Sequence, residues 1–286
     1  MIKLFFLLGC LSAFRAGAQG SAGAPLAQTD TGASGHQPDT LLKLVRQTPL
    51  EASDFSVDNL GNLYVITPDN QLKKFNAKGD SIGVFDEVKR YGTLGGIDVT
   101  NPLKLLLFYP DFMTVLALDN FLNRLYMIDL RQSGVLQCAT VTTSYDNNFW
   151  VFDEQNAQLK KMNDQGLAVM TSNDFRQLFG EAVDPQEIVD QGGLVYLNDP
   201  AQGIYVFDYY GGFKVKFSFK GVSGLKVFGK SIYGIRGNEL FTYRPGTLQE
   251  QRIQLPFAVK DAARIQIVLN GLYVLRGQVL YYYSIQ

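Results

Sequence analysis

The strongest constraint on the fold is a short apolar strand that recurs at intervals of about forty residues. Each copy follows a turn and carries an aromatic or large aliphatic side chain at its centre. The central residues are Tyr64, Leu106, Trp150, Tyr196, Tyr233 and Tyr273. A repeat of this length that contains only strands and turns is typical of the blades of a β-propeller. Helical solenoids and parallel βαβ units give other patterns.

The repeat is clearest in residues 54–85. This stretch predicts four strands, at residues 54–58, 63–67, 71–76 and 80–85, separated by turns rich in Asn, Asp, Pro and Gly. A single four-stranded antiparallel sheet cannot bury both of its faces. We therefore expect the copies to pack against one another around a common axis.

The two ends of the chain indicate how the ring closes. The sixth copy begins near Arg264, and the chain ends at Gln286 after only three further strands. A missing outer strand would leave an open sheet edge. Residues 41–47 are strand-like and precede the first copy, so they can complete the last sheet. The prediction is an all-β fold over residues 41–286: a six-bladed β-propeller of four-stranded antiparallel blades, closed by an N-terminal strand.

The first forty residues predict export. Residues 1–18 contain Lys3, an apolar run and a small-residue end, which is typical of a secretory signal peptide. A rival interpretation is a bacterial lipobox that ends at Cys10, where a lipid would tether the protein to a membrane, although the leader before it is short. Residues 19–40 are poor in large apolar side chains and are expected to form a flexible linker. We expect a periplasmic protein that is associated with the outer membrane.

Charge and residue counts exclude several functions. The formal net charge is −1, and removal of the signal peptide makes it more negative, so nucleic acid is not an expected partner. The single histidine, His36, lies in the linker, which leaves the propeller without histidine-based catalysis. Cys138 would be the only cysteine after cleavage, and we interpret it as a small buried apolar residue.

The loops between the second and third strands of the blades share one face of a propeller with the connections between blades. Loops on a rigid scaffold often carry function, so this face is the predicted binding surface. Its charges are sorted along the chain, with acidic residues in the first four blades and basic residues in the last two: Asp69, Asp111, Asp153, Glu154, Asp199, Arg236 and Arg276. The alternative is ordinary turn chemistry, because tight loops favour Asp, Asn, Pro and Gly.

The longest connection between blades, residues 171–186, is a second candidate for binding. Asn173 or Asp174 can cap a short helix that ends at Gly180. Phe175, Arg176 and Phe179 would then form a contact patch. The alternative is that this segment packs over the neighbouring blade.

We expect no catalytic residues and no cofactor. Asp54, Asp98 and Glu187 lie near the predicted channel mouth, where carboxylate oxygens can hold calcium. These carboxylates are scattered among the blades, and the basic residues Arg264 and Lys226 are predicted to face the same region. A metal site is therefore only the alternative interpretation.

The blade pattern at residues 58–79 resembles that of NHL-type propellers. The segments ASDF at 52–55, NPLK at 101–104 and YLNDP at 196–200 make the chain similar to a group of exported propellers from Bacteroidota. The resemblance covers about residues 41–286 and implies the fold and the compartment, and it brings no assigned catalytic residues.

Three functional hypotheses follow. The first is a non-catalytic interaction or scaffold module that binds envelope or outer-membrane proteins. The alternatives are a calcium-dependent, lactonase-like hydrolase, and a propeller that binds small ligands or glycans, for which exposed aromatic side chains would be needed.

Overall fold

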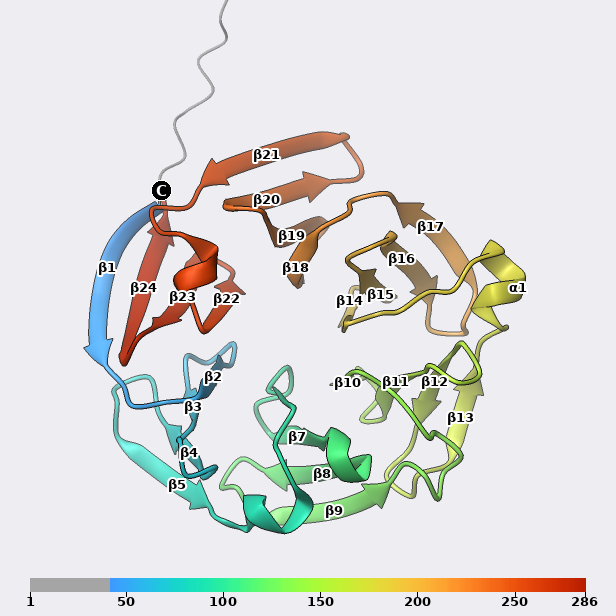
Figure 1. Cartoon of the computed structure of the whole chain (residues 1–286), viewed down its shortest axis with the longest axis horizontal. Coiled ribbons are helices and arrows are strands. Elements are labelled where there is room, and N and C mark those ends of the chain that lie inside the picture. The colour runs from blue at the N-terminus through green and yellow to red at the C-terminus, as the bar shows by residue number, and fades with distance from the viewer. Residues whose placement is uncertain (1–41) are drawn as a thin grey trace, which may run out of the picture. The chain divides into compact units, whose positions relative to one another are not determined.

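A computed structural model describes residues 42–286, apart from the side chains of Val88 and Lys89. These residues form six separate four-stranded antiparallel sheets arranged in a ring (Figure 1). The predicted six-bladed propeller is confirmed. The expected signal peptide, the linker, Cys10 and His36 lie outside the described residues.

The blades follow one another along the chain, and in blades 1 to 5 the four strands run in sequence order from the centre of the ring to its rim. Blades 1 to 3 comprise β2 (Asp54–Val57), β3 (Leu63–Ile66), β4 (Leu72–Phe75), β5 (Ser81–Phe85); β6 (Gly96–Asp98), β7 (Lys104–Tyr109), β8 (Thr114–Asp119), β9 (Arg124–Asp129); and β10 (Val141–Thr143), β11 (Phe149–Asp153), β12 (Gln158–Met162), β13 (Ala168–Thr171). Blades 4 and 5 comprise β14 (Glu187–Gln191), β15 (Leu194–Asp199), β16 (Gly203–Asp208), β17 (Phe213–Phe217); and β18 (Val222–Phe228), β19 (Ser231–Arg236), β20 (Glu239–Arg244), β21 (Gln249–Gln254).

Blade 6 joins the two ends of the described chain. It contains β22 (Arg264–Val268), β23 (Gly271–Arg276), β24 (Val279–Ile285) and, as its outermost strand, β1 (Leu42–Pro49). Strand β1 pairs antiparallel with β24, in a register that runs from Leu42 opposite Ile285 to Pro49 opposite Val279. The predicted closure by an N-terminal strand is therefore observed, and the strand extends two residues beyond the predicted end.

Side chains from neighbouring blades form the core. The central residues of the second strands in blades 1 to 3, Tyr64, Leu106 and Trp150, are completely buried. Trp150 belongs to a cluster that continues into blade 4 through Ile188 and Phe207. The large aromatic content therefore fills the space between twisted sheets, where each ring buries a large apolar area.

The turns between the third and fourth strands of blades 1 to 4 share one design. A side-chain oxygen in each turn accepts hydrogen bonds from the backbone N–H groups two and four positions later, as expected for Asn and Asp at tight turns. The residues are Asn76, Asp119, Asn163 and Asp208. This design fixes the backbone of the loops on the face that carries the first-to-second and third-to-fourth strand turns.

Short helices occur in the connections. They are η1 (Glu87–Tyr91), η2 (Pro110–Phe112), α1 (Phe175–Phe179) and η3 (Val259–Asp261). Helix α1 begins where predicted, because the Asp174 side chain accepts from the backbone N–H of Arg176, and it ends at Gly180, which adopts a φ of 69°. Within residues 42–286, no helix has the length and apolar composition that crossing a membrane requires.

Candidate functional site

The acidic residues of the predicted binding face serve mainly to shape its loops. Asp153 and Asp199 are 0% and 2% exposed. Asp153 pairs with Lys160, with 2.5 Å between Oδ2 and Nζ, and also accepts from Asn156. Asp199 accepts from three backbone N–H groups, including that of Asp184 at 2.9 Å. These two carboxylates are therefore structural, in agreement with the turn-chemistry alternative.

The other charged residues of that face do not gather into one site. Asp111 accepts from the backbone N–H of Thr93 at 2.8 Å, while Asp69 is exposed and Glu154 half-buried. Arg236 is half-buried, and the Arg276 guanidinium stacks over the ring of Tyr281 at 4.6 Å. The sorted charges of the sequence thus remain separate along the ring.

The aromatic residues of the 171–186 connection pack inward. Phe175 is fully buried and stacks on Phe207, with 4.7 Å between the ring centroids, which corrects its predicted role in a surface patch. Phe179 is half-buried against Tyr205. Arg176 stays exposed and pairs with Asp174 at 2.8 Å. Burial of two Phe rings stabilises the blade more than their exposure would, so the packing alternative describes this segment.

The three carboxylates considered for a metal connect neighbouring blades. Asp98 accepts from Thr142 Oγ1 at 3.1 Å and from the backbone N–H of Thr143. Glu187 accepts from the backbone N–H groups of Gly224 and Leu225 at 2.8 and 3.0 Å.

Basic side chains also lie near these carboxylates and interact with their charges. Asp54 lies 3.6 Å from the Arg264 guanidinium. Burial lowers the pKa of Lys226, whose charge interacts with Asp98 and Glu187. Among the residues that the structure describes, no three His, Cys, Asp or Glu side chains come together as metal ligands. The geometry of these carboxylates supports blade-to-blade contacts.

Cys138 is 5% exposed, and burial raises the pKa of its thiol above the usual value. We therefore expect iodoacetamide to leave Cys138 unmodified in the folded protein and to modify it fully in denaturant, since the thiolate is the reactive form. Peptide mapping by mass spectrometry measures the extent of modification in both conditions. Rapid alkylation in native buffer, at the rate of a free small-molecule thiol, would contradict this burial.

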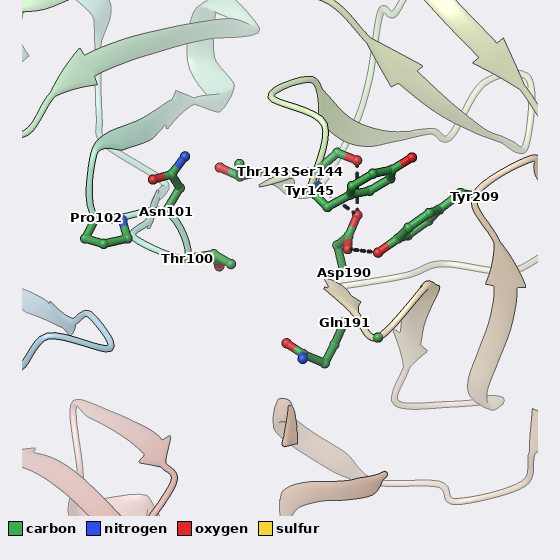
Figure 2. Close-up of a pocket in the computed structure, with 10 residues that line it drawn as sticks. Thr100, Asn101, Pro102, Thr143, Ser144, Tyr145, Asp190, Gln191 and Tyr209 are labelled. Carbon is green, nitrogen blue, oxygen red and sulfur yellow. Dashed lines mark hydrogen bonds between the residues drawn. The ribbon is translucent and has the colours of Figure 1, made fainter. Parts of the chain in front are cut away.

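A different cluster lies on the opposite face of the ring. It contains buried and exposed side chains that are joined by a hydrogen-bond network. We call it the tyrosine site: Tyr145 after β10, Trp150 on β11, Asp190 on β14 and Tyr209 after β16. The Asp190 carboxylate accepts from Tyr209 Oη at 2.7 Å and from Ser144 Oγ at 3.1 Å (Figure 2). It also accepts from Trp150 Nε1 at 2.8 Å. This network joins blades 3 and 4.

The network holds two aromatic rings in place. Tyr145 stacks on Tyr209 with 4.2 Å between centroids and an interplanar angle of 14° (Figure 2). Burial, together with the hydrogen bond and charge of Asp190, raises the pKa of the Tyr209 hydroxyl, which therefore stays protonated and donates. Tyr145 nevertheless remains 67% exposed. An exposed ring that is fixed by its neighbours is a preorganised contact surface.

Lys161, on β12, lies against this aromatic cluster. Its Nζ lies 4.8 Å from the Trp150 ring centroid and 5.3 Å from the centroids of Tyr145 and Tyr209. The ammonium also pairs with Asp146 at 2.9 Å. The cation–π position is thus already filled by a residue of the protein itself.

Two hollows flank the stacked tyrosines. The inner pocket, of about 340 Å³, is lined by Thr100, Asn101, Pro102, Thr143, Ser144, Tyr145, Asp190, Gln191, Gly192 and Tyr209. The outer pocket, of about 400 Å³, is lined by Tyr145, Asp146, Asn148, Lys161, Val169, Met170, Tyr209 and Tyr210. Both volumes fall within the range of small-ligand sites.

The sequence analysis did not predict the tyrosine site, although the positions of its tyrosines in polar turns were a signal in the sequence. Tyr145 follows Ser144 and precedes an Asp-Asn-Asn turn, and Tyr209 and Tyr210 precede Gly211. Tyrosines in tight polar turns have little to pack against and are therefore expected on the surface. The contact between Tyr145 and Tyr209 depends on how blades 3 and 4 pack in the ring. The spacing of the repeat does not predict which side chains meet between blades.

Comparisons with known proteins agree on the fold. No protein-family model and no curated protein matches the chain. Among solved structures, virginiamycin B lyase from Staphylococcus aureus with quinupristin is similar, with a TM-score of 0.59 and 12% identity over 86% of this chain and 89% of the other. BBS1N in complex with ARL6DN has a TM-score of 0.58 and 13% identity over 87% and 98% of the two chains.

A Bacteroides fragilis protein described as exported has a TM-score of 0.57 and 11% identity, covering 87% of this chain and 96% of the other. At these identities the similarity concerns the fold. It places the chain in the structural class of β-propellers, a class that includes both enzymes and proteins held in complexes.

Proposed function

We propose that this protein is a non-catalytic interaction propeller of the bacterial cell envelope, where it binds a protein partner through the surface around the outer pocket. One observation carries the proposal: Tyr210 is 91% exposed beside Tyr145 at 67% and Val169 at 55%. Tyrosine is among the residues enriched at the energetic centres of protein interfaces. Leu167, two residues before Val169, is also exposed, at 60%.

The rigid base of this surface supports the proposal. Tyr145 is stacked and Tyr209 is hydrogen-bonded, so a partner would meet side chains that lose little conformational freedom on binding. The carboxylate of Asp146, which pairs with the buried ammonium of Lys161, provides a polar border at the same pocket. This combination of apolar centre and polar rim is typical of specific interfaces.

Compartment and partner class rest on the sequence and on the structural neighbours. Residues 1–18 predict export, and a neighbour from Bacteroides fragilis is described as exported. Two other neighbours belong to protein complexes, BBS1N with ARL6DN and a chain of the Mitotic Checkpoint Complex. We propose a periplasmic location with association to the outer membrane through the partner. No observation favours the lactonase-like hydrolase, because Asp54, Asp98 and Glu187 contact neighbouring blades.

The test compares two exposed aromatic residues on opposite faces. The tagged protein is purified from detergent-solubilised envelopes as wild type, as Tyr210→Ala and as Phe112→Ala, and partners are quantified by mass spectrometry. Phe112 is 49% exposed on the face that the sequence favoured, so it is a matched control. We expect a stoichiometric partner that Tyr210→Ala reduces by about tenfold or more, as for an interface hot spot, and that Phe112→Ala retains. Loss with Phe112→Ala alone would move the interface to the other face.

A further inference from the structure

The inner pocket contains a buried polar atom that has no hydrogen-bond partner among residues 42–286. Thr143 is 4% exposed, and its Oγ1 has no hydrogen-bond partner within the described part of the chain. Figure 2 shows this hydroxyl on the side that faces Asn101, across the opening of the pocket. Leaving a buried hydroxyl unpaired is unfavourable, and native proteins rarely do so without a ligand or other partner. At the wall of a pocket, this hydroxyl is a candidate hydrogen-bonding group for a ligand.

The chemistry of the pocket wall defines the ligand class. Hydroxyl and amide groups of Thr100, Thr143 and Gln191 offer both donors and acceptors, and the Tyr145 ring offers an apolar wall. We propose that the inner pocket is a binding site for a neutral saccharide, with a ring hydroxyl bonded to Thr143 Oγ1 and apolar C–H groups against Tyr145.

Charged ligands fit this pocket less well. Asp190 is its one charged lining residue, and both carboxylate oxygens already accept hydrogen bonds from Tyr209, Trp150 and Ser144. A cationic ligand would find no free carboxylate. An anionic ligand would find no lining cation, because Lys161 belongs to the outer pocket. The pocket therefore suits a ligand that is neutral and rich in hydroxyl groups.

This site shares Tyr145 and Tyr209 with the proposed protein interface, but other residues distinguish the two. Tyr210 and Val169 line only the outer pocket, whereas Thr143 and Gln191 line only the inner one. Variants can therefore remove one function and leave the other, and failure of the saccharide proposal leaves the protein interface to be judged by its own experiment.

The decisive variant is Thr143→Val. Valine keeps the β-branched shape that suits β10 and replaces only the hydroxyl by a methyl group. Since that hydroxyl has no partner among the described residues, the midpoint of thermal unfolding should stay the same or rise. Affinity for the saccharide should fall about fivefold to tenfold, the usual effect of losing one hydrogen bond. Gln191→Ala, at an exposed position, should weaken binding in the same direction.

The probes are glucose, N-acetylglucosamine, maltose, cellobiose and N,N′-diacetylchitobiose, observed by saturation-transfer NMR and titrated by calorimetry. The expected result is binding of at least one probe by the wild type and by Tyr210→Ala, and weaker binding by Thr143→Val. Three results would overturn the proposal: no probe binds, a probe binds wild type and Thr143→Val equally, or only peptides or phosphorylated sugars bind.

Discussion

A chain that begins at residue 50 is expected to lose about 10–20 °C in its unfolding midpoint and to aggregate. This deletion removes β1, and with it every backbone hydrogen bond between β1 and β24. At about 1 kcal/mol net for each bond, the loss amounts to several kcal/mol, and each kcal/mol lowers the midpoint by roughly 2–4 °C in a protein of this size. The exposed edge of β24, with Tyr281, Tyr282 and Tyr283 in succession, would then be free to pair with other chains.

The matched control is a chain that begins at residue 41. It keeps β1 and should unfold at the same midpoint as a chain that begins at residue 19. Differential scanning calorimetry gives the midpoints, and light scattering follows aggregation. If the chain from residue 50 unfolded in one transition at the midpoint of the control, β1 would not stabilise the ring.

Asp190→Ala is expected to destabilise the propeller by about 3–5 kcal/mol. The carboxylate is 9% exposed, and its removal leaves the indole N–H of the fully buried Trp150 and the hydroxyl of Ser144 without acceptors. Buried donors that lose a charged partner carry a penalty of this size. Tyr209 would also lose its hydrogen bond, so the stack with Tyr145 should loosen.

Asp190→Asn separates geometry from charge. Its amide oxygen can still accept from Trp150 and Ser144, while its NH₂ group can donate to Tyr209 Oη, so we expect a cost of only about 1–2 kcal/mol. Asp208→Asn, in the exposed turn before Tyr209, preserves the acceptor of that turn and should change stability by less than about 1 kcal/mol. Urea unfolding, followed by the fluorescence of Trp150, the single tryptophan, measures the free energy of unfolding of all three variants. Equal stability of Asp190→Ala and wild type would refute the network.

Local patterns were sufficient to predict the blades. Alternating apolar strands and turn residues are properties of short segments, and they correctly gave the six copies and the cap and end of the helix at Asp174 and Gly180. The ring closure was also predictable, because residues 41–47 had strand character and the sixth copy lacked an outer strand.

The functional surface depended on contacts that local patterns do not contain. Asp153 and Asp190 look alike in sequence, as acids near strand ends. Only the packing of blades 3 and 4 shows that Asp153 pairs within its own blade with Lys160, whereas Asp190 collects donors from the neighbouring blade. Likewise, the sequence indicates only that Phe175 is an aromatic residue in a loop. The structure shows that it stacks on Phe207.

The position of β1 also decides which side of the ring stays accessible when the protein is attached to a surface by one end of the propeller. The chain enters the described fold at blade 6, and the ring places blade 3 across from it (Figure 1). Because Leu42 pairs with Ile285, both ends of the propeller leave from the same blade. A surface, bead or fusion partner joined directly at either end of the propeller, residue 42 or residue 286, therefore attaches on the far side of the ring from blade 3, and immobilised protein keeps this region accessible to whatever it binds.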